Sequence, residues 1–139
     1  MTPEQILAAT LWAEDRGGSE EGMEPIAGVM LNRAESPGWW GRDVVGVCLS
    51  PGQFSGWHWK DPNFRKCLTV DESDPQYVLA LAIARTALRG DPIKRANGAD
   101  HYYAKSMTIQ PAWASVDGNL RPIVYETAHH FFLKVGLFG

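Results

Sequence analysis

The sequence predicts a mainly α (α+β) domain with a small antiparallel β element. Three segments, which begin near Thr2, Glu20 and Asp74, combine helix start signals with apolar residues at helical spacing. Residues 36–74 are rich in Gly, Pro and Trp, which predicts ordered loops with a short helix. Short segments after residue 97 have the composition of strands.

The first helix is predicted from Thr2 to about Glu14. Thr2 suits the N-cap, Pro3 the first helical position, and Gln5 completes a capping box. Residues 16–18, Arg-Gly-Gly, end this helix because glycine readily adopts the left-handed conformation that closes helices. These signals place Glu14 at the C-terminal end of a helix.

Two further helices are predicted downstream. The second spans about Glu20–Arg33, with acidic residues in its first turn and Pro25 early enough to be tolerated. The third has Asp74 as its cap, Pro75 at its first position and Gly90 after its end. Because this third segment is apolar nearly all round, we expect it to be the central buried helix.

The C-terminal part of the chain is predicted to hold the β element. Residues 97–104, NGADHYYA, predict a short strand, and residues 117–119, DGN, predict a turn. Residues 122–133, PIVYETAHHFFL, fit a strand or a helix, and their pattern leaves both open.

Length and charge restrict the class of protein. We expect one domain over residues 1–139, since the chain can bury a core but is short for two domains. The net charge of −3 and the scattered basic residues argue against a nucleic-acid partner. No segment is long and apolar enough to insert into a membrane, and the N-terminus lacks the basic flank of a signal peptide. We expect a monomer that is made in the cytoplasm.

Aromatic residues are concentrated in the irregular segments. The chain has six Trp, and those in Gly/Pro-rich connections are Trp39, Trp40, Trp57, Trp59 and Trp113. They either cover a small core or line a sugar-binding cleft, because flat apolar rings with a polar edge suit the apolar faces of pyranoses. Composition leaves both interpretations open.

Glu14 is the candidate catalytic residue. Leu7, Leu11 and Glu14 have the spacing i, i+4 and i+7, so the carboxylate lies on the helix stripe that faces the core. Burial and the negative end of the helix dipole both disfavour the carboxylate, and a raised pKa suits a general acid. The alternative is structural: Glu14 pairs with Arg16 or Arg33, or is exposed at a frayed end.

Residues 14–33, EDRGGSEEGMEPIAGVMLNR, resemble the opening motif of the cell-wall hydrolase family that includes the spore-cortex-lytic enzyme SleB. That motif is E-A-R-G-E, a spacer, Gly and an apolar helix that ends in L-N-R. Later segments resemble further family motifs in the same order: GQFSGW at 52–57 (Q-F-S), GADHYYA at 98–104 (G-A-T-H-Y-Y), PAWA at 111–114 (P-x-W) and AHHFF at 128–132 (G-x-H-x-F). The resemblance covers nearly the whole chain.

The chain departs from the family pattern at four positions. Asp15 replaces the usual Ala, Gly18 the second Glu, Asp100 a Thr, and Ala128 a Gly. Gly18 argues against any mechanism that needs a second carboxylate at that position, but it leaves the expected role of Glu14 intact.

The resemblance implies a lysozyme-like fold and cleavage of the β-1,4 bond between N-acetylmuramic acid and N-acetylglucosamine in peptidoglycan, the expected partner. It implies a lytic transglycosylase, in which Glu14 acts as acid and then as base to give a 1,6-anhydro sugar. A hydrolytic muramidase is the alternative and normally uses two carboxylates. Asp15 points about 100° away from Glu14 on a helix. Asp71, Asp100 and Glu126 stay open as the second carboxylate.

Further residues are expected to bind substrate. Gln53 and Ser55 suit hydrogen bonds to the sugar, or else stabilise their turn. Tyr102 and Tyr103 alternate across a strand, so one of them faces the cleft, where we expect its hydroxyl to orient Glu14. The expected set is Gln53, Phe54, Ser55, Trp57, His101, Tyr102, Tyr103, Trp113 and His130, with Trp57 and Trp113 as the candidates for stacking on sugar.

Two other functions stay open. Four His together with Cys48 and Cys67 permit a zinc amidase on the same polymer, but no ligand spacing is recognisable, so we expect no metal and no cofactor. Nothing else in the sequence suggests an oxidising framework, so we expect the two cysteines to be free or buried thiols. A non-catalytic wall-binding or virion structural module has no need of a buried acid. The short chain is typical of a bacteriophage or prophage endolysin, or of a virion-associated enzyme.

Overall fold

The computed structural model describes residues 1–15, 20–36, 38, 40–51, 53–105, 110–111, 114, 120–123 and 129–134. Several predictions from the sequence therefore lie outside the described residues. These are the helix stop at 16–18, the turn at 117–119, and the positions of Trp39, Trp113 and Glu126. Within the described part of the chain, each helix is too short or too polar to cross a membrane.

Helices α1 and α5 begin where their predicted caps place them, and α2 begins at the predicted Glu20. Helix α1 spans Pro3–Glu14, and the Thr2 hydroxyl accepts from the Gln5 amide while the Gln5 side chain accepts from the Thr2 amide. Helix α2 spans Glu20–Glu35 and contains Pro25. Helix α5 spans Pro75–Leu88, and the carboxylate of Asp74 accepts from the first free amides of the helix.

The irregular middle of the chain holds more helix than its composition predicts. Two short helices occur, α3 at Val44–Leu49 and α4 at Phe64–Thr69. A 3₁₀ turn, η1, covers Ser55–Trp57 between them, and a second, η2, covers Ala96–Gly98. The Asp43 side chain caps α3 by accepting from the Gly46 amide. Only one short helix is expected from the sequence, because six-residue helices give too little periodicity to detect.

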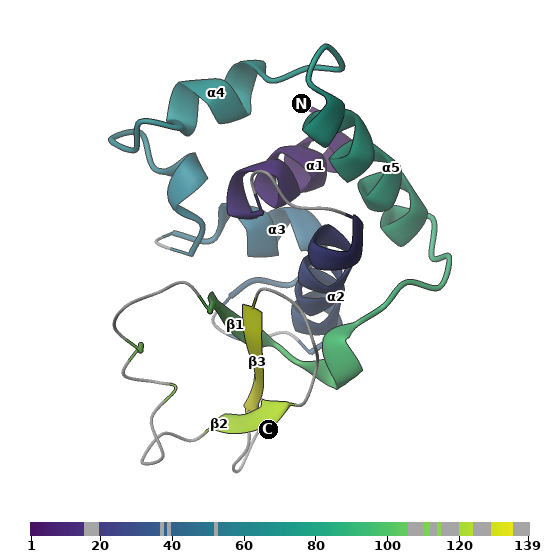
Figure 1. The fold of residues 1–139 in the computed structure, drawn as a ribbon, viewed down its shortest axis with the longest axis vertical. Helices are drawn as coiled ribbons and strands as arrows, with labels where there is room; N and C mark the ends of the chain where they lie inside the picture. The colour runs from purple at the N-terminus through teal and green to yellow at the C-terminus, as the bar shows by residue number, and fades with distance from the viewer. Residues whose placement is uncertain are drawn as a thin grey trace.

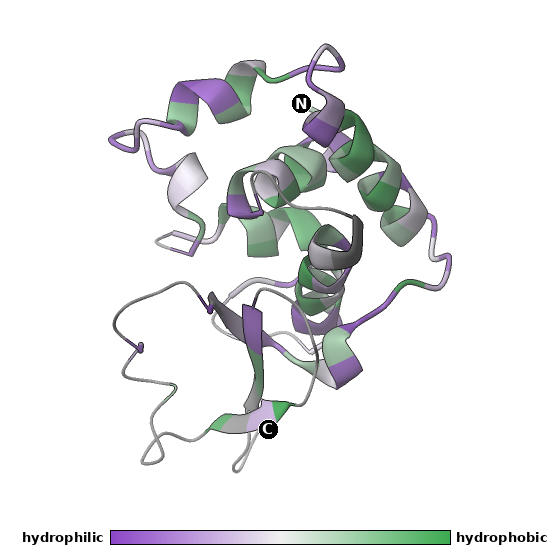
Figure 2. Ribbon diagram, viewed as in Figure 1, coloured by the Kyte–Doolittle hydropathy of each residue, from purple (hydrophilic) through white to green (hydrophobic). Residues whose placement is uncertain are grey.

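Helix α1, and not α5, is the central helix. Six consecutive residues of α1, from Leu7 to Trp12, are buried, and α1 packs against α5, α3 and α2 (Figure 1). Helix α5 buries one face, while Val78 on its other face is 47% exposed. The prediction of α5 as the central helix is therefore wrong: apolar residues such as Val78 and Ala82 lie on its exposed face. Figure 2 shows the hydrophobic residues gathered along α1, α3 and α5.

The three strands form one antiparallel sheet with the order β1-β3-β2. Strand β1 is His101–Ala104, β2 is Leu120–Ile123 and β3 is His129–Lys134. Within 122–133, the described residues are therefore strand and not helix. Figure 1 shows the sheet at the opposite end of the molecule from α4, below α1 and α3, with α2 to one side.

Helix α2 carries the segment that leads into the sheet. The Asn32 side chain donates to the carbonyls of Arg95 (3.0 Å) and Ala99 (2.9 Å). Gly28 lets the chain at residues 94–95 approach the helix, because a Cβ there would lie 2.5 Å from Arg95 Cα. This close packing fixes where β1 starts relative to α2, and so where its side chains point.

Candidate active site

Glu14 occupies the last turn of α1, on the stripe that the sequence predicts. Leu7 and Leu11, earlier on the same stripe, are fully buried, and Glu14 is partly buried. The Asp15 amide donates to the Leu11 carbonyl and closes the helix. The carboxylate therefore projects from the central helix at the point where that helix ends.

Tyr102, in the middle of β1, donates its hydroxyl to Glu14 Oε1 at 2.5 Å. Burial raises the pKa of Tyr102 well above its ordinary value, and the nearby Glu14 raises it further, so the phenol keeps its proton and remains a donor. Tyr103 points to the other face of the sheet, where its ring stacks on Phe132. The structure thus places Tyr102, of the two tyrosines, against Glu14.

The environment of Glu14 combines opposing effects on its ionisation. Burial raises the pKa of Glu14, and this is the largest effect. The hydrogen bond from Tyr102 and the charge of Arg33 both favour the carboxylate and lower the pKa in part. The acid form is favoured by burial, while two specific groups are in place to stabilise the anion once a proton has left.

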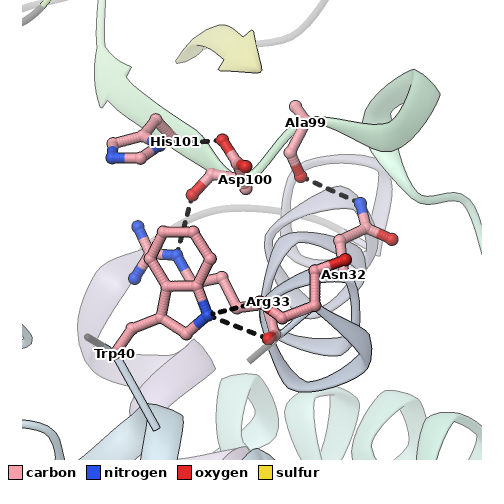
Figure 3. Close-up of polar contacts among 7 residues, drawn as sticks. Asn32, Arg33, Trp40, Ala99, Asp100 and His101 are labelled. Carbon is pink, nitrogen blue, oxygen red and sulfur yellow. Dashed lines mark hydrogen bonds and ion pairs between the residues drawn. The ribbon is translucent and has the colours of Figure 1, made fainter. Parts of the chain in front are cut away.

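Arg33, near the end of α2, is a buried cation beside this pair. It is 5% exposed, and its Nε donates to the Asp100 carbonyl at 2.7 Å (Figure 3). Its guanidinium carbon lies 5.5 Å from the centre of the Trp40 ring and 5.9 Å from that of Phe54. Its Nη1 is buried without a hydrogen-bond partner among the described residues. Burial lowers the pKa of Arg33, and the neighbouring Tyr102, Asp100 and Glu14 oppose this.

Trp40 is hydrogen-bonded to the backbone at the C-terminal end of α2. Its indole Nε1 donates to the carbonyls of Arg33 (2.9 Å) and Ser36 (3.2 Å) at the end of α2 (Figure 3). The ring of His101 meets Trp40 edge to face at 5.9 Å, and His101 Nδ1 lies 2.8 Å from the Asp100 carboxylate. The sequence-predicted His101 therefore lies next to the Arg33 cluster, on the other face of β1 from Tyr102.

His129 lies against Tyr102 in the candidate site, whereas the sequence predicts its neighbour His130 as the site residue. It is 5% exposed, and its ring meets the ring of Tyr102 edge to face at 5.3 Å. Burial lowers the pKa of His129, which favours the neutral ring. His130 is exposed and packs on Tyr103 instead. Strand alternation puts His129 on the face of Phe131 and His130 on that of Phe132, but the sequence does not say which of the two faces meets Tyr102.

The loop that carries Gln53, Phe54, Ser55 and Trp57 packs against the same end of α1. Gly56 makes this possible, because a Cβ there would lie 3.2 Å from Ala13 Cβ and 2.8 Å from Cys67 Sγ. Phe54 is buried under Arg33, Gln53 is partly buried, and Ser55 is exposed. The indole of Trp57 donates to the Thr10 hydroxyl at 2.8 Å. This loop therefore lies against the second half of α1 and against Arg33.

The other carboxylates do not join Glu14 as far as the structure describes them. Asp15 turns toward Gly22 of α2, and its buried Oδ2 has no partner among the described residues. Asp71 lies by Thr2 and Gln5, at the opposite end of α1. The Asp100 carboxylate contacts His101. Glu126 lies outside the described residues.

Cysteine and histidine do not assemble into a recognisable ligand set. Cys48 and Cys67 are both buried, and burial raises the pKa of Cys48 to about 12. Within the described ranges, no group of three or more His, Cys, Asp or Glu side chains is arranged to hold a metal ion.

Comparisons with known proteins identify the family of the chain and a solved structure with a similar fold. A family model described as Cell Wall Hydrolase matches residues 17–133, a range that begins just after Glu14 and includes Arg33 and Tyr102. Curated proteins give no match. Among solved structures, the chain is similar to the catalytic domain of the germination-specific lytic transglycosylase SleB from Bacillus anthracis. The TM-score is 0.68, with 24% identity over 94% of this chain and 93% of that one. This likeness shows a lysozyme-like fold with a small sheet.

Proposed function

Since the chain belongs to the cell wall hydrolase family, we propose that it degrades peptidoglycan by cleaving the glycosidic bond between N-acetylmuramic acid and N-acetylglucosamine. The observation that carries the proposal is the hydrogen bond from Tyr102 to Glu14, inside a cluster that also holds Arg33. The pair places a partly desolvated carboxyl group, with a raised pKa, at the end of the central helix. Such a group suits general acid catalysis.

The proposed reaction is that of a lytic transglycosylase. Tyr102 donates to Oε1 of Glu14, so Oε2 is the oxygen left to carry the catalytic proton. Glu14 gives this proton to the leaving glycosidic oxygen as the bond from that oxygen to C1 breaks. The resulting carboxylate then takes the proton of the muramic C6 hydroxyl while O6 bonds to C1. The product is a 1,6-anhydro sugar, and Glu14 regains its proton.

Tyr102 and Arg33 have supporting roles in this proposal. After the first proton transfer, Glu14 carries a negative charge in a poorly solvated position, which is costly without compensation. The phenol of Tyr102 and the cation of Arg33 both stabilise that charge. Burial favours the protonated state at the start of the cycle. The same environment therefore supports both halves of an acid and base cycle with one carboxyl group.

A hydrolytic muramidase is the alternative. It would use a second carboxylate beside a bound water. Among the described residues, Asp15, Asp71 and Asp100 are directed elsewhere or bound to other groups. This arrangement favours the single-carboxylate route over the hydrolytic one.

Digestion of purified peptidoglycan, followed by mass spectrometry of the released muropeptides, tests the proposal. We expect wild-type protein to release muropeptides with anhydro-muramic ends, and Glu14→Gln to reduce the rate by about 10²-fold or more. Asp15→Asn is the matched control, because it makes the same chemical change at the next residue and should leave the rate within about twofold.

Each other outcome has a defined meaning. Reducing ends instead of anhydro ends would establish a muramidase. Release of stem peptides with loss of activity in EDTA would establish a zinc amidase. A Glu14→Gln protein with wild-type activity would remove Glu14 from the mechanism, and absence of any cleavage by the folded wild type would indicate a wall-binding module.

A further inference from the structure

A pocket of about 690 Å³ lies beside η1, between the end of α3 and the loop of residues 58–62. Its volume is within the range of about 300–1,000 Å³ that is usual for small-ligand sites. Aromatic rings make much of its lining, from Phe54, Trp57, His58 and Trp59. Glu14 and Tyr102 do not line it, so the proposed chemistry leaves it unexplained.

The pocket lies next to the cluster around Glu14. Phe54 belongs to both, because its ring lines the pocket and lies 5.9 Å from the Arg33 guanidinium carbon. Trp57 also lines the pocket, and it contacts Thr10, one helical turn before Glu14 on α1. The pocket therefore lies against the second half of α1, within a turn or two of the helix end that carries Glu14.

Two tryptophans present different surfaces to the pocket. Trp57 is fixed, because its indole donates to Thr10, whose own hydroxyl donates to the Ile6 carbonyl at 2.7 Å. Trp59 is 71% exposed, with the His58 ring nearly parallel to it at 6.3 Å and Lys60 Nζ 5.0 Å from its centre. Trp59 therefore lines the pocket while most of its surface is in water. A flat ligand that covers it would gain the free energy of apolar burial.

The charges around the pocket favour a neutral ligand. Lys60 and Asp61 are consecutive, opposite in charge, and both line it. The hydroxyls of Ser50 and Ser55 add polar groups without charge. Stem peptides of peptidoglycan carry several carboxylates and would need a net positive site, whereas the glycan hydroxyl and N-acetyl groups need only hydrogen-bond partners beside aromatic surface.

We infer that this pocket is a second glycan subsite, which binds an N-acetylated pyranose of the strand away from the bond that Glu14 acts on, with Trp59 as the stacking surface. The inference rests on the proposed function for the identity of the polymer. It adds a specificity-determining contact outside the Glu14 cluster.

The test measures binding by isothermal titration calorimetry to full-length Glu14→Gln protein, so that the ligand is not cleaved. The probes are a neutral β-1,4-linked tetramer of N-acetylglucosamine and, separately, the free tripeptide L-Ala-γ-D-Glu-diaminopimelate. We expect the tetramer to bind, and Trp59→Ala to weaken it about tenfold, while Trp59→Phe keeps most of the affinity. Leu68→Ala is the matched control, because Leu68 is also exposed, at 50%, but lies on α4 outside the pocket lining.

The outcomes separate this inference from the proposed function. Equal tetramer affinity in the Trp59→Ala and parent proteins would overturn the subsite, and so would Trp59-dependent binding of the tripeptide alone. In the catalytically intact protein, Trp59→Ala should slow peptidoglycan release and leave the type of muropeptide end unchanged. Tetramer binding that depends on Trp59, in a protein that releases no anhydro ends, would uphold the subsite and refute the lytic reaction.

Discussion

Replacing Tyr102 by Phe removes one hydroxyl and keeps the ring that packs on His129 and Phe131. The lost interaction is the 2.5 Å hydrogen bond to Glu14 Oε1. A hydrogen bond to a charged group contributes about 1.5–3 kcal/mol. Because this bond favours the carboxylate, its loss leaves the anion that forms after proton donation less stable by about that amount. The rate of the chemical step should fall by about 10- to 100-fold.

The pH dependence should change in a defined direction. The hydrogen bond from Tyr102 lowers the pKa of Glu14, so its removal raises that pKa further above the ordinary value. Glu14 must be protonated to act first as an acid. Activity is therefore lost as pH rises through the pKa of Glu14, and the alkaline limb of the pH–rate profile should move to higher pH in Tyr102→Phe.

The assay is the initial rate of muropeptide release from purified peptidoglycan across the pH range, with circular dichroism to verify folding. Tyr103→Phe is the matched control, since it removes a hydroxyl from the next residue of β1, on the face that packs against Phe132 and His130. An unchanged rate and an unmoved alkaline limb in Tyr102→Phe would refute the assigned role. So would an equal effect of Tyr103→Phe.

Three further changes test the packing and electrostatics of the site. Gly28→Ala should destabilise the protein by about 1–3 kcal/mol in urea unfolding, because its Cβ would lie 2.5 Å from Arg95 Cα; unchanged stability would contradict that close approach. Glu14→Gln should raise the melting temperature over that of the wild type more at pH 8 than at pH 4. The reason is that the pKa of Glu14 is raised in the folded protein, so the wild type loses stability as pH rises from the ordinary pKa of Glu through the pKa of Glu14 in the folded state. An equal gain at both pH values would argue against burial of the charge. Thr10→Val removes the acceptor of the Trp57 indole and should cost about 1–3 kcal/mol and blue-shift or broaden tryptophan emission; an unaltered spectrum and unfolding midpoint would mean that Thr10 does not hold Trp57.

The local signals in the sequence were enough for the helices that carry the site. The Thr2 cap and Gln5 start α1, and the spacing of Leu7, Leu11 and Glu14 puts the carboxyl group on the buried stripe. These properties depend on neighbours within a turn or two of helix, which periodicity and capping describe well. The same signals failed for α5, because apolar character all round a helix does not distinguish a central position from one in which a single face is buried.

The contacts that complete the site were decided by the tertiary structure. Glu14 and Tyr102 are 88 residues apart, and Arg33 and Asp100 are 67 apart. Strand alternation says that one of Tyr102 and Tyr103 faces the helices, but the choice depends on how Asn32 and Gly28 of α2 position the segment before β1. The same is true of His129 and His130, whose faces follow from the pairing of β3 with β1.

The sequence by itself determined that a carboxyl group ends a buried helix, since that property is encoded by residues within one helix. The tertiary structure alone decided which phenol meets Glu14, which cation lies beside it, and that Trp57 binds Thr10 while Trp59 is left exposed. The physical reason is that burial and charge at one atom depend on elements that are distant in the chain. No local pattern records how those elements pack.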